Sequence, residues 1–310
     1  MTAITKKVEI PSASPLNYYQ ALSAPGEMPR TVVDGKLFLP PGAARSGGWP
    51  LVIVVPGSLG VDASHLGHAE ALAGAGLAAF VLDSFGARGI TSTVTNQTQY
   101  SFAASAWDVL AAWRALSALP EIDAARIGAQ GHSRGGSAVL TAATRRFADA
   151  ALGPGLGLAA VLAAYPWSGH QFLDPAVGAT RIRVLMGDRD DWCSVQQVQG
   201  HLQAIRLTGG AVSLRLFGGA AHSFDKRSPL VRIDDARVAP GGPTAYLAAD
   251  GAYVHPLTGR ADPKLTDRDV AVYNLKAGYG VRGATLGGTQ AEADEFRADM
   301  LAFWSAALRA

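Results

Sequence analysis

The stretch RIGAQGHSRGGSAVL, residues 126–140, contains a serine in the pattern Gly-x-Ser-x-Gly. An apolar run precedes this pattern and a helix-forming run follows it. A serine on a tight strand-to-helix turn exposes its hydroxyl, and the helix N-terminus presents N–H groups to a developing oxyanion. The pattern therefore predicts that Ser133 is a nucleophile. A structural glycine turn is one alternative, and a phosphate-binding loop is disfavoured because the Gly-Lys-Ser/Thr spacing is missing.

A serine nucleophile needs a base, and the base needs an acid that orients it. Asp190 follows the apolar run RIRVLM, and His222 follows the apolar run VSLRLFGGA. The order serine, acid, histidine at successive strand ends is the one expected after a Gly-x-Ser-x-Gly turn. We therefore predict that His222 is the base and Asp190 the acid. Asp188 and Asp191 stand in the same loop and are alternatives for the acid.

The remaining histidines lack this position. Of the seven in the chain, three fall in predicted helices, where we expect surface or core-edge sites: His65, His68 and His201. His132 precedes the nucleophile and is expected to point elsewhere on the turn. Two others do not follow a predicted core strand: His170 and His255.

An oxyanion intermediate needs two backbone donors. One is expected from the N–H of Arg134, the residue after the nucleophile. The second is expected from the glycine-containing loop VVPGSLG after the first core strand, at Ser58, with Leu59 as the alternative.

Apolar runs that alternate with helical runs indicate the fold class. The runs expected to be strands are 50–57, 77–83, 126–131, 159–166, 181–187 and 212–219. The runs expected to be helices are 63–76, 103–119, 136–151 and 194–205. Continuous apolar strands are typical of a parallel sheet that is covered on both faces. We therefore predict one α/β domain over 1–310, with a mostly parallel sheet and helices on both faces.

Three regions lie outside this alternation. Residues 1–30 are expected to be an N-terminal extension, and the early runs TKKVEIP and TVVDGKLFLP to be antiparallel edge strands. Residues 226–288 show no clean period, and we predict a long irregular segment that borders the active site. The end of the chain predicts an amphipathic helix with Thr289 as its N-cap.

Composition narrows the function classes. The net charge is +2 with mixed signs, which gives no case for nucleic-acid or anionic-membrane binding. One cysteine, Cys193, excludes an internal disulfide, and we expect it to be a small buried hydrophobe. No cluster has metal-ligand spacing, so we expect no metal and no cofactor. A cytoplasmic location is expected, although an exported protein whose signal has been removed has the same features. The oligomeric state is not predicted.

These residues together resemble the dienelactone hydrolase family of α/β-hydrolases. The stretches that carry the resemblance are VIVVPGSLG, FVLDSFGARG, GHSRGG, GDRDDW and GAAHSFD. The resemblance implies an α/β-hydrolase fold, the triad Ser133, Asp190 and His222, and cofactor-free hydrolysis of a small ester or lactone. The chain departs from the founding enzymes, which have cysteine at the nucleophile and a glutamate where Gly57 stands here. A broader carboxylesterase is therefore expected.

The resemblance also implies that Arg88 binds a carboxylate of the substrate. The alternative is that Arg88 braces its own loop by pairing with Asp83 or with a carbonyl. Aromatic residues at other strand ends are candidates for lining the pocket or for packing: Tyr165, Trp167 and Trp192. The same triad suits a serine peptidase or amidase, a thioesterase or an acyltransferase. A non-catalytic binding protein of hydrolase fold is the alternative from another class.

Overall fold

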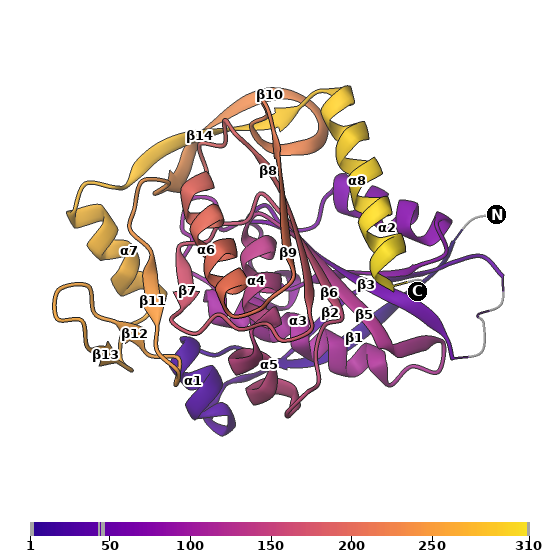
Figure 1. The fold of residues 1–310 in the computed structure, drawn as a ribbon, viewed down its shortest axis with the longest axis horizontal. Helices are drawn as coiled ribbons and strands as arrows, with labels where there is room; N and C mark the ends of the chain where they lie inside the picture. Colours follow the sequence, from indigo (N-terminus) through magenta and orange to yellow (C-terminus); the bar gives the residue numbers. More distant parts are fainter. Residues whose placement is uncertain (1–2, 43, 45–46, 309–310) are drawn as a thin grey trace.

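The central sheet of the computed structural model has eight strands in the order β1-β2-β4-β3-β5-β6-β8-β9 (Figure 1). The structure describes residues 3–42, 44 and 47–308. The sheet strands are β1 (Ile4–Ala13), β2 (Arg30–Leu39), β3 (Trp49–Val55), β4 (Ala78–Asp83), β5 (Ile122–His132), β6 (Ala160–Ala164), β8 (Arg181–Gly187) and β9 (Val212–Phe217).

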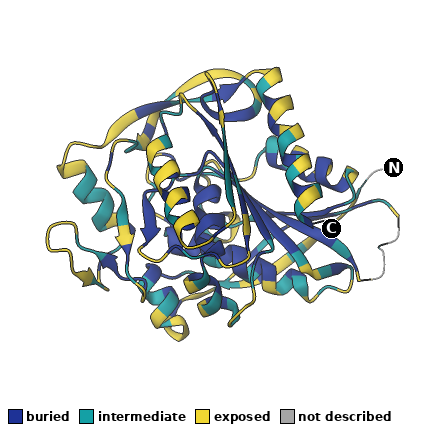
Figure 2. Ribbon diagram, in the orientation of Figure 1, coloured by how far each residue is buried: buried dark blue, intermediate teal, exposed yellow. Residues whose placement is uncertain are grey.

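Strands β3, β4, β5, β6, β8 and β9 are parallel, whereas β1 and β2 join antiparallel at one edge. The inner strands are buried along their length, because the sheet is covered on both faces (Figure 2). This arrangement confirms the predicted fold class, including the antiparallel N-terminal strands. The carboxyl ends of the parallel strands share one edge, which is where ligands bind in such sheets.

The helices divide between the two faces as right-handed crossovers require. The chain passes from β3 to β4 in one direction, then through β5, β6, β8 and β9 in the other. Helix α2 (Ala63–Gly74) therefore covers one face, and α3 (Phe102–Ser117), α4 (Arg134–Ala143) and α6 (Val195–Leu207) cover the other. Helix α8 (Gln290–Leu308) contacts α2 and lies on its face (Figure 1). None of the helices in the described part of the chain has the length and apolarity needed to cross a membrane.

One helix prediction changes in detail, one is confirmed, and one helix was not predicted. The run 136–151 forms two helices, α4 and α5 (Arg145–Leu152), because Thr144 between them has an extended backbone. The C-terminal helix begins as predicted, since Thr289 and Glu292 form reciprocal hydrogen bonds: the Thr289 N–H donates to the Glu292 carboxylate, and the Glu292 N–H donates to Thr289 Oγ1. A short helix, α1 (Tyr18–Ser23), lies in the segment expected to be an extension.

The prediction of an irregular segment at 226–288 is wrong. Its elements are the end of β10 (His222–Val238), β11 (Ala245–Leu247), β12 (Tyr253–Val254), β13 (Ala261–Asp262), α7 (Asp267–Lys276) and β14 (Val281–Gly288). Strand β10 pairs with β14 through several register shifts, and β11 pairs with β7 (His170–Phe172). Shifted registers and strands of two or three residues have no periodic pattern of apolar residues, which explains why these strands were not predicted.

Three histidines that we expected at the surface or core edge are buried: His65, His68 and His201. His201 on α6 is 4% exposed, and neither ring nitrogen has a hydrogen-bond partner among the described residues. Burial lowers the pKa of His201 to about 4, so the ring is neutral at pH 7.

This burial predicts an acid-dependent loss of stability. Below pH 6.5 His201 is protonated in the unfolded chain, whereas in the folded chain it stays neutral down to about pH 4. The free energy of unfolding therefore decreases as the pH falls from 6.5 to 4. The free energy of unfolding is expected to drop by about 1–2 kcal/mol more between pH 7 and pH 5 in the wild type than in His201→Leu. Urea titrations at both pH values measure this difference. Equal drops in the two proteins would contradict it.

Candidate active site

Ser133 occupies a strained turn between β5 and α4. Its φ of 55° and ψ of −115° are unusual for a residue with a side chain, and its N–H donates to the Ala164 carbonyl at 2.9 Å. A Cβ at Gly131 would lie 2.0 Å from the Gly135 carbonyl oxygen, and a Cβ at Gly135 would lie 2.2 Å from that of Val55. Glycine is therefore required at both positions for α4 to approach the strands this closely.

His222 and Asp190 meet Ser133 at the same sheet edge. His222 Nε2 lies 2.9 Å from Ser133 Oγ, and His222 Nδ1 lies 2.7 Å from Asp190 Oδ2. The other Asp190 oxygen accepts the N–H groups of Trp192 and Cys193 at 2.8 and 2.9 Å. The carboxylate is thus fixed by its own loop. In a neutral His222 the Nδ1 N–H then donates to Asp190, and the Nε2 lone pair faces the serine hydroxyl.

The two other aspartates of this loop have different partners. Asp188 accepts the N–H of Gly219 at 2.7 Å, and Asp191 accepts the N–H of Thr285 at 2.8 Å. Both carboxylates tie the acid loop to neighbouring segments. Of the three aspartates, Asp190 is the one that contacts His222.

The residues predicted to bind an oxyanion surround Ser133. Arg134 is the first residue of α4, so its N–H has no acceptor within the helix. Ser58 lies close by, since a Cβ built on Gly57 would be 3.1 Å from Ser133 Cβ. The Ser58 carbonyl accepts the Thr93 N–H at 2.8 Å, and its Oγ donates to Gln97 Oε1 at 3.0 Å. Leu59 is 44% exposed and lines a small hollow of about 30 Å³ beside Ser133 and His222.

The His222 ring packs against two aromatic rings. Trp192 stacks on it with ring centroids 5.3 Å apart and planes at 19°, and Tyr165 meets it at 4.7 Å and 64°. Trp192 is itself fixed by its indole N–H, which donates to the Thr285 carbonyl. Both rings therefore pack against the imidazole and restrict its rotation.

A cleft of about 410 Å³ reaches Ser133. Much of its lining is apolar or aromatic: Phe102, Trp167, Trp192, Val238, Val270, Ala271 and Val281. Arg237 and Arg268 are exposed residues of the same lining. The segment after His222 therefore borders the site, since β10, α7 and β14 all contribute to the cleft. Trp167 lines the cleft as the sequence suggested, whereas Tyr165 lines only the small hollow beneath His222.

Most residues of the cleft lining were not predicted from the sequence, among them the polar residues Gln97, His170 and Asp267. His170 was set aside because it does not follow a core strand, yet it starts β7 and packs on Trp167 with ring centroids 4.6 Å apart. Burial lowers its pKa to about 4, so the ring is neutral. These residues stand on the β7 strand, on α7 and in the loop after β4, where no sequence signal linked them to the nucleophile.

The guanidinium of Arg88 is bound within the protein. It makes a two-pronged ion pair with Asp108, at 2.8 and 3.1 Å, and donates to the carbonyls of Ser84 and Ala13. The Arg88 side chain is 10% exposed and the Asp108 side chain is fully buried. These contacts are those of a loop brace, although the partner is Asp108 rather than the expected Asp83, and Arg88 is not part of the cleft lining.

Cys193 lies beside the acid and base but is 3% exposed. Burial raises the pKa of its thiol well above the usual range, so it stays protonated. Its position matches the expectation of a small buried hydrophobe.

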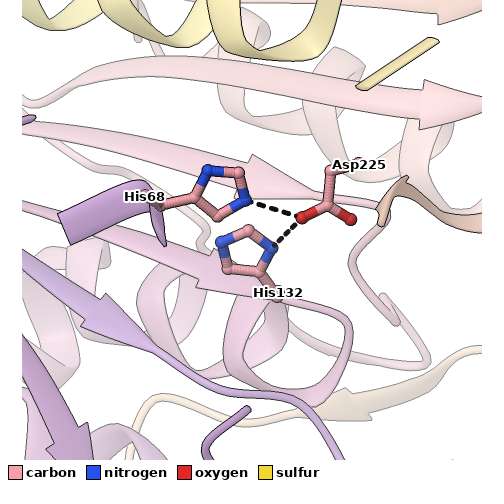
Figure 3. Close-up of side chains that lie close together, drawn as sticks. All are labelled: His68, His132 and Asp225. Atoms are coloured by element: carbon pink, nitrogen blue, oxygen red, sulfur yellow. Dashed lines mark hydrogen bonds and ion pairs between the residues drawn. The ribbon is translucent and has the colours of Figure 1, made fainter. Parts of the chain in front are cut away.

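A second cluster behind the nucleophile joins His68, His132 and Asp225, all buried (Figure 3). His68 Nε2 lies 2.7 Å from Asp225 Oδ2, and His132 Nδ1 lies 3.5 Å from the same oxygen. Gln130 Nε2, whose amide oxygen accepts the Trp304 indole N–H, faces His132 Nε2 at 3.1 Å. The amide N–H must donate there, so the ring proton of neutral His132 is on Nδ1. A protonated Nδ1 cannot bind a metal ion, and the cluster is a hydrogen-bond network.

Comparison with known proteins agrees with this geometry. A model of the dienelactone hydrolase family matches residues 33–240 of the sequence. The chain belongs to the dienelactone hydrolase family. No curated protein matches it.

Solved structures share the fold of this dienelactone hydrolase family member. The dienelactone hydrolase-like promiscuous phosphotriesterase P91, from metagenomic libraries, has 17% identity and a TM-score of 0.59, with 98% of each chain covered. The structure named m3DLH has 24% identity and a TM-score of 0.55, covering 72% of this chain and 86% of that one. Dienelactone hydrolase from Anabaena variabilis has 19% identity and a TM-score of 0.51, covering 72% and 89%.

The Arg88–Asp108 pair predicts a stability effect. Arg88→Ala leaves a buried carboxylate unpaired, so the free energy of unfolding is expected to fall by about 3–5 kcal/mol. Urea denaturation measures the loss, and hydrolysis of matched neutral and anionic esters by the folded fraction serves as the control. A selective loss on anionic esters would contradict the bracing role and favour a substrate carboxylate as the partner.

Proposed function

We propose that this protein is a serine hydrolase that cleaves carboxylic esters or lactones of small molecules through an acyl-enzyme. The observation that supports it is the continuous contact Ser133–His222–Asp190, at 2.9 and 2.7 Å, with Ser133 in the lining of the apolar cleft. A partly buried serine that lines the cleft, a base in hydrogen-bond reach and an acid that orients the base are what acyl transfer requires.

The first step is attack of Ser133 Oγ on the carbonyl carbon. His222 Nε2 takes the hydroxyl proton, and the Asp190 carboxylate stabilises the resulting imidazolium. The Trp192 ring stacked on the imidazole presents its face to the same charged form. The backbone N–H groups of Ser58 and Arg134 are the proposed oxyanion donors, each worth on the order of 3 kcal/mol in the transition state.

The second step releases the alcohol and regenerates the serine. His222 returns its proton to the leaving oxygen, the carbon–oxygen bond breaks, and the acyl group remains on Ser133. Water then enters, gives a proton to His222 and attacks the acyl carbon; the carboxylic acid leaves and Ser133 recovers its proton. This cycle uses only side chains and backbone amides of the chain, and substrate in the cleft faces mainly apolar and aromatic walls.

Covalent labelling tests the nucleophile. A fluorophosphonate probe is expected to label the wild type and to leave Ser133→Ala unlabelled, since the probe forms its bond with the activated hydroxyl. Hydrolysis of short p-nitrophenyl esters is expected to disappear with it. Circular dichroism of Ser133→Ala controls for folding. A folded wild type without labelling would favour a non-catalytic binding protein.

A substrate panel addresses the group that is cleaved. It compares lactones, aliphatic and aromatic esters, anilides and thioesters, with a phosphotriester included because P91 is described as a promiscuous phosphotriesterase. Esters or lactones are expected to give the highest kcat/KM. Faster cleavage of anilides or thioesters would replace this proposal with an amidase or a thioesterase on the same residues.

The identity of the acid gives a separate prediction. Asp190→Asn keeps the shape of the loop but removes the charge that stabilises the imidazolium, so kcat is expected to fall by about 10⁴-fold. Asp188→Asn and Asp191→Asn are matched controls in the same loop, and each is expected to keep kcat within about tenfold. An equal loss in either control would assign the acid role elsewhere.

A further inference from the structure

A chain of hydrogen bonds runs behind the nucleophile and can be given proton positions. The Trp304 indole N–H donates to Gln130 Oε1 at 2.9 Å, so the Gln130 amide N–H donates to His132 Nε2 at 3.1 Å. His132 then carries its proton on Nδ1, which lies 2.9 Å from the Tyr165 hydroxyl oxygen. Burial lowers the pKa of His132 well below its usual range, in agreement with a neutral ring.

The chain continues through Tyr165 to a buried carboxylate. The Tyr165 hydroxyl donates to Asp225 Oδ1 at 2.7 Å, and the His68 ring N–H donates to Asp225 Oδ2 at 2.7 Å. Figure 3 shows Asp225 facing the rings of His68 and His132. Each of these groups therefore has a partner of the opposite hydrogen-bonding character, which fixes the Tyr165 hydroxyl in one place.

This network connects the segments that bear the proposed nucleophile and base. His132 directly precedes Ser133, and Asp225 follows His222 by three residues on β10. Tyr165 stands between them, adjacent to Ala164, whose carbonyl holds the Ser133 N–H. The bonds from His132 to Tyr165 and from Tyr165 to Asp225 thus form a second bridge between the two segments, beside the direct contact from Ser133 to His222.

Tyr165 is held in a costly conformation at this bridge. Its φ of 37° is in the left-handed region, its side chain is 1% exposed, and its N–H donates to the Leu185 carbonyl. The centroid of its ring lies 4.7 Å from that of the His222 ring, on which Trp192 is stacked. A strained, buried residue against the base is the kind of feature that a reaction centre retains for geometry.

We propose that Tyr165 and Asp225 are positioning residues for His222, which hold its ring at hydrogen-bonding distance from Ser133. This inference rests on the proposed serine hydrolase mechanism. The ring of Tyr165 packs against the imidazole of His222, and Asp225 fixes that ring by accepting a hydrogen bond from its hydroxyl. Without the bond, the ring of Tyr165 gains freedom and His222 with it, so fewer enzyme molecules have the geometry for proton transfer.

Two conservative variants test the proposal: Tyr165→Phe removes only the hydroxyl, and Asp225→Asn removes the charge and replaces one of the two acceptor oxygens by an N–H donor. Each is expected to lower kcat and the rate of fluorophosphonate labelling by about ten- to a hundredfold, with KM within about twofold. Tyr165→Phe is the milder change and keeps the test valid if Asp225→Asn does not fold.

Tyr100→Phe is the matched control. Its hydroxyl also donates to a buried carboxylate, that of Asp108, but Tyr100 is not part of the cleft lining. It is expected to lose stability in urea with kcat unchanged. A labelling rate equal to the wild type in Tyr165→Phe, or an equal loss of kcat in Tyr100→Phe, would overturn the positioning role.

A measurement that needs no turnover separates this inference from the proposed function. The Nδ1 proton that His222 shares with Asp190 is expected to give a low-field proton resonance in the wild type and in Tyr100→Phe. The resonance is expected to broaden or vanish in both bridge variants. A resonance of wild-type shape in the two bridge variants would refute the positioning role, even if no probe labels the protein. Absence of labelling in the wild type would instead refute the proposed function.

Discussion

The close approach of helix α4 to strands β3 and β5 is the constraint on which the site depends. At Gly131 and Gly135 a single methyl group would collide with backbone oxygens, 2.0 Å and 2.2 Å away. The approach brings the N-terminus of α4 to the sheet edge and forces the residue between strand and helix into a strained conformation. Ser133 is exposed toward His222 because of this packing, so the geometry at the hydroxyl is a property of the core and not of a flexible loop.

The sequence contained enough information for the parallel core and for the order of the serine, acid and histidine segments. Those signals are local, because each apolar run followed by a glycine-containing turn can be interpreted from its own residues, without the rest of the chain. The choice among Asp188, Asp190 and Asp191 was not local. It depends on which carboxylate the loop N–H groups turn toward His222, and Gly219 and Thr285 bind the other two from distant segments.

Burial was the property that the sequence concealed most. His65 and His68 were expected at the surface or core edge, and His132 on a turn, yet all three are buried. His68 is hydrogen-bonded to Asp225, and His132 to Tyr165. Such partners come from different strands and helices and leave no periodic pattern in the chain. The elements of 226–288 were missed for a related reason, since short strands with shifted registers have no repeat to detect.

The paired strands β10 and β14 bring the two ends of residues 239–280 together at the sheet edge. The triad contacts lie outside that interval, whereas a large part of the cleft lining lies within or next to it. The interval also supplies buried side chains to the main core, namely Leu247, Tyr253 and Leu265. One length of polypeptide therefore forms cleft walls on one side and core packing on the other, so a change within it affects the shape of the cleft and the stability of the fold together.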